Sequence, residues 1–222
     1  MSTPWDVFAF RHLPVGPLEP FSWTPYAGYG PGLELLCLDK GSSVLELGCG
    51  RGDRLVHCLK AGYRAVGVDV SAVAVSSASR WGHRDLRLHH DDATHYLRNT
   101  TEVFDAVVSV FGAHWFTDPA ALLPRVRTRL REGGVVALAH VPPADPDDSA
   151  RYAEAPGGET VLRWEGASVQ WAVALEAAGF ERAAVTSIEP PHRSGGVRTV
   201  VVTARAVPRA QGARGRRPAL PH

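Results

Sequence analysis

The stretch that most constrains how this chain can fold is a glycine-rich turn between a short apolar segment and an amphipathic one. Apolar side chains in Val44–Leu47 are spaced as in a short buried strand. Glycines then follow at every second position: Gly48, Gly50 and Gly52. A residue without a Cβ lets the backbone turn sharply and approach a ligand closely. Residues 53–61 predict a helix whose N-terminal amides point back into the turn. The order of strand, glycine turn and helix indicates a nucleotide-type pocket.

The glycine spacing distinguishes two kinds of cofactor site. A dinucleotide fingerprint, G-x-G-x-x-G, would need its third glycine where this chain has Asp53. The motif here is Glu46-x-Gly48-x-Gly50-x-Gly52, which resembles the first motif of the class I S-adenosylmethionine (SAM) dependent methyltransferases. The resemblance implies SAM as the cofactor, with contacts from Glu46, Cys49 and the three glycines. SAM ends in an amino acid and has no pyrophosphate, so an acidic residue near the turn can help hold its ammonium group.

The composition limits the classes of protein to which the chain can belong. Its 222 residues suffice for one sizeable domain, and 45% hydrophobic and 21% charged residues are ordinary for a soluble globular protein. A formal net charge of +1 argues against a surface dedicated to nucleic acid or membrane, and no apolar run is long enough to span a bilayer. The three cysteines are odd in number and lack metal-ligand spacing, so we expect reduced thiols in a cytoplasmic protein.

The second predicted strand, residues 64–70, carries an acidic residue near its end. In an open parallel sheet ligands gather at the carboxyl ends of the strands, so Asp69 can bind ribose hydroxyls. Its alternative role is to cap the next helix, which Ser71 could equally do. Residues 67–71 match the second motif of the methyltransferase family, and this resemblance assigns Asp69 and Val70 to the cofactor site.

The third predicted strand, residues 86–90, leads to another acidic position. In the family, an acidic residue followed by a small one at this strand end meets the adenine, and Asp92 and Ala93 match that pair. The carboxylate can accept from the exocyclic amine, while the next backbone amide donates to the ring. The His and Asp residues at 89–92 suggest a metal site as the alternative, but consecutive strand residues point to opposite faces. We therefore predict no metal site.

The fourth predicted strand, residues 104–110, ends at Val110, which the resemblance assigns to the cofactor site. The glycine-containing loop after it carries His114 and Trp115. Methyl donor and acceptor should meet at this strand end. The run resembles small-molecule methyltransferases with a similar His-Trp pair, whereas the Asn/Asp-Pro-Pro-Tyr/Phe motif of the amino-methylating DNA enzymes is missing.

His114 is the candidate catalytic residue. Imidazole titrates near neutrality and can act as a general base for an acceptor of high pKa. The alternative is a pocket-lining or structural histidine. The side chains that we expect to contact the acceptor are Tyr26, Tyr29, His114, Trp115 and His140.

The remaining segments complete an α/β fold. Helices are expected at residues 32–39, 72–81, 119–130 and 168–178, and a fifth strand at 135–140. Two last strands, 180–188 and 197–204, are too close in sequence for a helical crossover, so they should pair as an antiparallel hairpin. We expect a Rossmann-like, doubly wound, seven-stranded sheet that is mostly parallel, ends in this hairpin and has helices on both faces.

Three regions of the chain are expected. Residues 1–31 form an aromatic N-terminal arm without regular periodicity, which either packs onto the domain or acts as a lid over the cofactor. Residues 32–205 form the methyltransferase domain. Its polar loop at 141–161 either contacts the substrate or lies loosely on the surface. Residues 206–222 are a basic tail for which disorder is expected, with weak nucleic-acid contact as the alternative.

The motifs together predict a SAM-dependent methyltransferase. It would move a methyl group to an oxygen, nitrogen or carbon atom of a small-molecule acceptor, such as a biosynthetic intermediate. The sequence leaves open the acceptor and the oligomeric state. One alternative is a SAM-binding or partner-binding module that has lost its chemistry. Another is an NAD(P)-dependent reductase, which the glycine spacing opposes. A nucleic-acid methyltransferase is disfavoured by the near-neutral charge.

Overall fold

The computed structural model describes residues 3–12, 17–145, 150–155, 158–191 and 195–207. Most of the tail for which disorder is expected, residues 208–222, lies outside the described residues. No helix among the described residues is long and apolar enough to cross a membrane.

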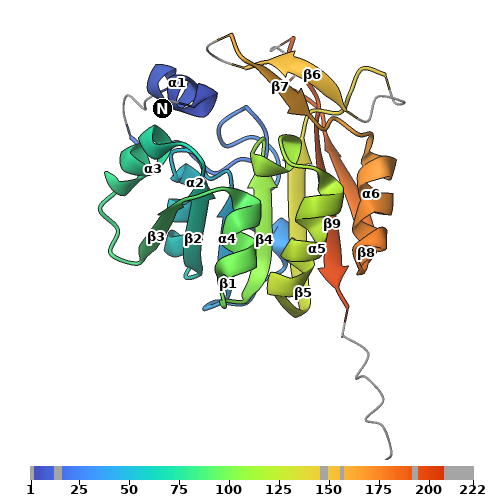
Figure 1. The fold of residues 1–222 in the computed structure, drawn as a ribbon. Helices are drawn as coiled ribbons and strands as arrows, with labels where there is room; N and C mark the ends of the chain where they lie inside the picture. Colours follow the sequence, from blue (N-terminus) through green and yellow to red (C-terminus); the bar gives the residue numbers. More distant parts are fainter. Residues whose placement is uncertain (1–2, 13–16, 146–149, 156–157, 192–194, 208–222) are drawn as a thin grey trace, which may run out of the picture.

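A single seven-stranded sheet organises the fold, with the strand order β3-β2-β1-β4-β5-β9-β8 (Figure 1). The register pairs β9 antiparallel to both of its neighbours, and every other pair in the sheet is parallel. The strands are β1 (Ser43–Leu47), β2 (Arg64–Asp69), β3 (Leu86–His90), β4 (Phe104–Val110), β5 (Leu130–His140), β8 (Phe180–Ile188) and β9 (Thr199–Ala206). The predicted fold class, including the antiparallel C-terminal hairpin, is confirmed.

Helices cover both faces of this sheet. One hydrophobic core joins the sheet to α4, α5 and α6, and a second core on the other face joins it to α2 and to the segment around Trp23 and Leu36. The helices are α1 (Pro4–Arg11), α2 (Asp53–Lys60), α3 (Ala72–Ser79), α4 (Ala93–Asn99), α5 (Pro119–Arg129) and α6 (Ser168–Ala177), with short 3-10 turns η1 (Leu33–Leu36) and η2 (Ala113–Trp115). The doubly wound arrangement brings the carboxyl ends of β1 to β4 to one edge of the sheet.

Alternation along β1 explains where its one acidic side chain lies. Leu45 and Leu47 belong to the core under α4 and α5, whereas Val44 belongs to the core under α2. Since successive side chains of a strand point to opposite faces, Glu46 lies on the α2 side with Val44. All five residues of the strand are buried. A carboxylate is thereby placed in the interior directly before the glycine turn.

The N-terminal region contains a helix that the sequence analysis did not predict. Thr3 and Asp6 form a reciprocal capping box at the start of α1, and Pro4 occupies its first turn. This capping signal was readable in the sequence, but the Pro and Gly residues around it favoured an irregular arm. The Asp6 carboxylate also accepts hydrogen bonds from Ser71 Oγ (2.7 Å) and the Val73 amide (3.3 Å), so it fastens α1 to the start of α3.

Other elements also differ from the expectations. The segment expected as a polar loop contains a two-stranded hairpin, β6 (Arg151–Glu154) with β7 (Thr160–Arg163), which lies above the sheet edge (Figure 1). Helix α4 was not predicted, and the helix expected at residues 32–39 is only the turn η1. Strand β5 begins earlier than expected, because its pairing with β4 continues past an irregularity at Gly133, whose φ is +74°.

Replacing Asp6 with alanine should loosen α1 without unfolding the sheet. The amide of Thr3, with Ser71 and Val73, lowers the pKa of Asp6 to about 2 from 3.8. The contact is therefore at full strength above about pH 4 and is lost as the pH falls through about 2. Losing a helix cap costs about 1 kcal/mol, so α1 amides should exchange hydrogen roughly fivefold faster in Asp6→Ala, with β1 amides unchanged. Unaltered exchange in α1 would show that other contacts hold it.

Candidate functional site

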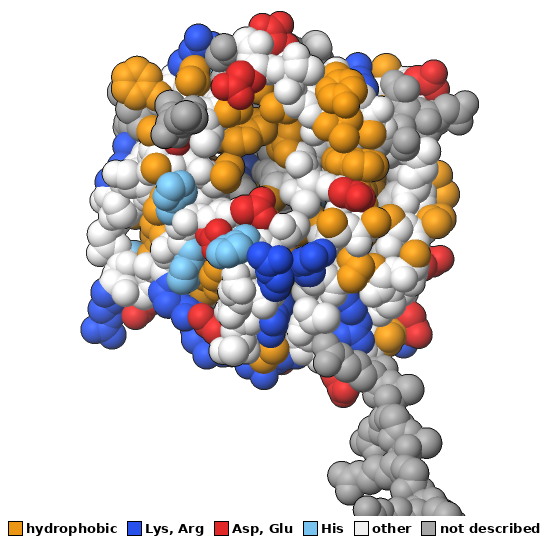
Figure 2. Space-filling model, viewed as in Figure 1, with side chains coloured by type: hydrophobic (Ala, Val, Ile, Leu, Met, Phe, Trp, Pro, Cys, Tyr) orange, Lys and Arg blue, Asp and Glu red, His pale blue; other side chains and the backbone are white. Residues whose placement is uncertain are grey.

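A cavity of about 720 Å³ opens at the carboxyl ends of the parallel strands. Its floor comes from residues that follow β1, β2, β3 and β4, and its cover comes from the N-terminal segment and the β6–β7 hairpin. Apolar side chains gather in the upper part of the molecule, where α1 and this hairpin lie (Figure 2). The size is in the range of pockets that enclose small organic molecules.

The glycine turn after β1 shapes one end of the cavity. Gly48 has a φ of +74°, and a Cβ there would lie 2.5 Å from the backbone nitrogen of Ala113. Gly50, at φ +52°, would project a Cβ into open space. Gly48 and Gly50 both line the cavity with Cys49 between them. Gly52, also at positive φ, is the N-cap of α2 and is not part of the lining. The backbone of the turn is thus exposed to a ligand at Gly50.

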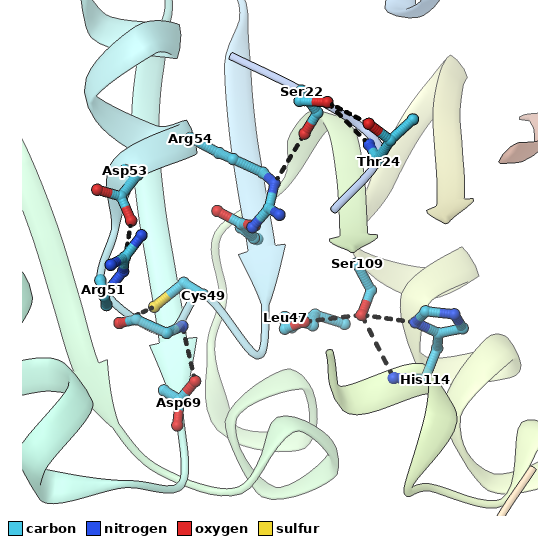
Figure 3. A network of polar contacts seen from close by, with 12 residues as sticks. Ser22, Thr24, Leu47, Cys49, Arg51, Asp53, Arg54, Asp69, Ser109 and His114 are labelled. Carbon is cyan, nitrogen blue, oxygen red and sulfur yellow. Dashed lines mark hydrogen bonds and ion pairs between the residues drawn. The ribbon is translucent and has the colours of Figure 1, made fainter. Parts of the chain in front are cut away.

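Asp69 ties this turn to the end of β2. One carboxylate oxygen accepts a hydrogen bond from the Gly50 amide (Figure 3), and the other accepts one from the Ser71 amide, each at 2.8 Å. Burial raises the pKa of Asp69, although these two hydrogen bonds oppose that change. Asp69 and Val70 line the cavity, and their contacts with the cofactor stay predictions. Each carboxylate oxygen retains a second lone pair for a ligand hydroxyl.

Glu46 does not reach the cavity, although the family resemblance assigned it to the cofactor. Its side chain is fully buried, and its Oε1 lies 3.5 Å from Arg54 Nη1. Burial raises the pKa of Glu46 to about 7. Arg54 lines the cavity and also donates from Nε to the backbone oxygen of Ser22 (Figure 3). Glu46 therefore contacts a lining residue without lining the cavity itself.

The end of β3 contributes Asp92 and Ala93 to the lining. Asp92 caps α4, since its Oδ1 accepts from the amides of Thr94 (2.9 Å) and His95 (3.0 Å). The neighbouring Asp91 pairs with His95 and also faces the cavity. Within the described ranges, no group of three or more His, Cys, Asp or Glu side chains is placed to hold a metal ion. The contact of Asp92 with adenine stays a prediction.

His114 lies beneath the cavity instead of lining it. Ala113 and Trp115 on either side line the cavity, but His114 is fully buried. Its Nδ1 is 2.9 Å from Ser109 Oγ, which itself donates to the Leu47 carbonyl (Figure 3). Since that hydroxyl proton is already used, Nδ1 must carry the hydrogen and donate to Ser109. This position does not support direct contact of His114 with an acceptor.

Electrostatics agree with this position. Burial, together with the nearby His140, lowers the pKa of His114 well below its usual value. Burial also lowers the pKa of His140 to about 4. Within the described residues, Nε2 of His114 and both ring nitrogens of His140 lack hydrogen-bond partners. His140 is fully buried and absent from the cavity lining, so the structure places both histidines in the core under the floor.

The remaining predicted acceptor contacts divide in the same way. Trp115 lines the cavity, whereas Tyr26 and Tyr29 do not. Val110, which the resemblance assigns to the cofactor site, also lines the cavity. The Tyr26 hydroxyl instead accepts from the Val197 amide (2.7 Å), which ties the N-terminal segment to the loop before β9. Lining residues that the sequence analysis did not single out as site residues include Trp5, Phe8, Phe21, Phe116 and Arg163. The aromatic ones were visible only as a group in the arm.

The two buried histidines should stay neutral in moderately acidic solution. In NMR titration, we expect the His140 ring to protonate with a midpoint near pH 4 and the His114 ring not to protonate above that pH. Because an unfolded histidine protonates near pH 6.5, His140 reduces stability as the pH falls from about 6.5 towards 4. The raised pKa of Glu46 has the opposite effect, since it increases stability as the pH falls. The denaturation midpoints of the unchanged protein and of His140→Leu, compared at each pH, therefore isolate the contribution of His140. A ring that titrates near pH 6.5 would contradict its buried position.

A family model described as a methyltransferase domain matches residues 44–134, which span the glycine turn and the first four helix-strand units around it. A curated relative, trans-aconitate 2-methyltransferase from Azoarcus sp. (strain BH72), is 32% identical over 109 residues. That alignment covers 46% of this chain and 40% of the relative, so this chain matches less than half of the relative's length.

Solved structures share the fold over a larger part of the chain. A proposed SAM-dependent methyltransferase from Listeria monocytogenes has a TM-score of 0.63 and 16% identity, and the match covers 75% of this chain and 90% of that chain. The 1,6-didemethyltoxoflavin-N1-methyltransferase from Burkholderia thailandensis, solved with 1,6-didemethyltoxoflavin and S-adenosylhomocysteine (SAH), has a TM-score of 0.60 and 23% identity. That match covers 76% of this chain and 72% of the other. With the sheet order, these comparisons confirm the predicted resemblance: residues 44–134 match a methyltransferase domain, and the fold is that of solved SAM-dependent methyltransferases.

Proposed function

We propose that this protein binds SAM and transfers its methyl group to a small-molecule acceptor. One observation carries the proposal: a single cavity joins the exposed Gly50 backbone and the Asp69 carboxylate to a wall of aromatic side chains. The first part has the polar groups that a nucleoside and an amino acid require. The second has the apolar surface that an organic acceptor requires.

The residues present fit the cofactor. Open space at the position of a Gly50 Cβ lets a ligand approach the backbone of the turn, and Asp69 retains lone pairs for ribose hydroxyls. Asp92, Ala93 and Val110 line the same cavity and would enclose the adenine side. When bound, SAM supplies an electrophilic methyl group on a sulfonium. The chain's own task is then to hold the two reactants in line and to exclude water.

The N-terminal region supplies the cover that water exclusion needs. Trp5 and Phe8 of α1 line the cavity, and Trp5 lies 4.3 Å from the Phe116 ring, centroid to centroid. We therefore keep residues 1–31 as a lid over a methyltransferase domain at 32–205. The hydrogen bonds of Asp6 to α3 hold this lid near the end of β2.

The size of the cavity favours a small acceptor, and the proposal does not assign which of its atoms is methylated. A cavity of about 720 Å³ leaves limited space beside a nucleoside-sized cofactor, which favours a metabolite or biosynthetic intermediate over a macromolecule. The curated relative is named for trans-aconitate, a tricarboxylic acid, but the alignment covers too little of that protein to transfer its acceptor. His114 is not assigned as the base here, because it is buried below the cavity. Three free cysteines are consistent with a cytoplasmic location.

Asp69→Asn should weaken SAH binding while leaving the sheet folded. Asparagine can still accept one hydrogen bond but has lost the charge, and a hydrogen bond to a charged group is worth about 1.5–3 kcal/mol, or roughly tenfold to a hundredfold in affinity. Calorimetric titration with SAH, SAM and NADPH measures the change. Asp85→Asn, an exposed carboxylate away from the lining, is the matched control and should bind as the unchanged protein does.

The outcomes separate the competing functions. Unchanged SAH affinity in Asp69→Asn would remove Asp69 from the cofactor site. Binding of NADPH alone would replace the methyltransferase proposal with the reductase alternative. Binding of SAH without turnover of any acceptor would favour a cofactor-binding module that has lost its chemistry.

A further inference from the structure

One wall of the cavity carries an arginine that the cofactor half does not use. Arg163 is the last residue of β7, and it lines the cavity with Ala153 and Val161 from the same face of the hairpin. The amide of the next residue, Trp164, donates to the Trp115 carbonyl at 2.7 Å, which fastens the end of β7 to η2. The guanidinium carbon of Arg163 therefore lies 5.0 Å from the centre of the Trp115 ring. Arg163 is held over an aromatic floor and is not a free surface side chain.

Two guanidinium groups share one carboxylate at this wall. Arg151 and Arg163 are directly opposite in the β6–β7 register, an arrangement that is unfavourable for like charges. Glu165, whose side chain is only 4% exposed, pairs with both of them. One negative charge against two positive charges leaves an excess positive charge. Burial lowers the pKa of Arg163, and the nearby positive charge of Arg151 lowers it further.

Two hydrogen-bond donors at this wall also lack acceptors. Nε of Arg163 and Nε1 of Trp115 are buried, and neither has a partner among the described residues. Both belong to residues of the cavity lining. A buried donor without an acceptor costs about 1–3 kcal/mol, and more for a charged group. Glu154 also lines the cavity, but none of the hydrogen bonds and ion pairs among the described residues joins its carboxylate to Arg163 or Trp115.

We propose that the acceptor carries a carboxylate group and that Arg163, stacked on Trp115 and held by Glu165, binds it. This inference rests on the proposed function, since it assigns the acceptor class of the same cavity. A carboxylate matches the single excess charge and the planar guanidinium. A phosphate dianion would be under-compensated by one net positive charge. The Arg163 side chain is 26% exposed and lines the cavity, so binding would turn its unpartnered Nε towards the acceptor.

The proposal gives different roles to Arg163 and Arg151. Arg163 lines the cavity, whereas Arg151 pairs with the same Glu165 from outside it, with a side chain 53% exposed. Removing either arginine subtracts one positive charge from the same cluster. Only the loss of Arg163 removes a donor from the cavity.

The test is calorimetric titration of the SAH-loaded protein with matched acids and amides. The probes are succinate, benzoate, indole-3-acetate and trans-aconitate, each against its neutral amide. We expect at least one acid to bind with 1:1 stoichiometry and about tenfold or more tighter than its amide. Arg163→Gln should lower the affinity for that acid about tenfold or more, while Arg151→Gln should change this affinity by less than about threefold. Arg163→Lys keeps the positive charge but loses the planar guanidinium, so its affinity for the acid should lie between those of Arg163→Gln and Arg151→Gln.

SAH titration of the same samples keeps this inference separate from the proposed function. Three results would overturn the carboxylate site in a protein that binds SAH: no acid binds, acids and amides bind equally, or Arg151→Gln and Arg163→Gln lose affinity equally. If acids bind with the expected selectivity but SAH does not, the anion site stands and the methyltransferase proposal fails. Thermal melting of each variant confirms that it is folded before it is compared.

Discussion

The structure around the cavity depends on one carboxylate, that of Asp69. It accepts from the Gly50 amide on one side and from the Ser71 amide on the other. The first bond holds the glycine turn against the end of β2, and the second sets the start of α3. Ser71 then donates to Asp6, so the same series of hydrogen bonds continues into α1. A half-buried, charged acceptor can support such a series because hydrogen bonds to a charged group are stronger than neutral ones. The cofactor end of the cavity and its cover are thereby connected through one side chain.

Ionisable side chains are also buried beneath the floor of the cavity, where they do not line it. Glu46 is paired with Arg54, and His114 donates to Ser109 under the floor. Burial changes each of them towards its neutral form, raising the pKa of the carboxyl and lowering the pKa of the imidazole. Their positions make them supports of the turn and of the loop after β4. Methyl transfer from a sulfonium asks mainly for alignment and a dry site, so a floor of neutral groups suits the proposed reaction.

The two halves of the cavity come from different kinds of structure. The cofactor half is built from turns after consecutive parallel strands, whose places are set by the sheet. The acceptor half is built from α1, the loop after β4 and the β6–β7 hairpin, which are far apart in the sequence. Arg163 reaches Trp115 only because the hairpin end is bonded to η2. Such covering segments can change without disturbing the sheet, which is how one fold serves many acceptors.

The sequence by itself determined the sheet and the cofactor turn, because both depend on local patterns. The run Phe104–Val110 is apolar enough to predict a buried strand. The glycine turn and Asp69 each lie at the end of a predicted parallel strand, so both were expected at the same edge of the sheet. The tertiary structure decided which side chains face the cavity. His114 and Trp115 are neighbours in the sequence, yet η2 buries the first and turns the second towards the cavity. Successive side chains of a helical turn point in different directions, and residue type alone does not show which one faces the cavity. Likewise, Arg163 gained its role from a pairing with Arg151 and Glu165 that exists only once β6 and β7 meet.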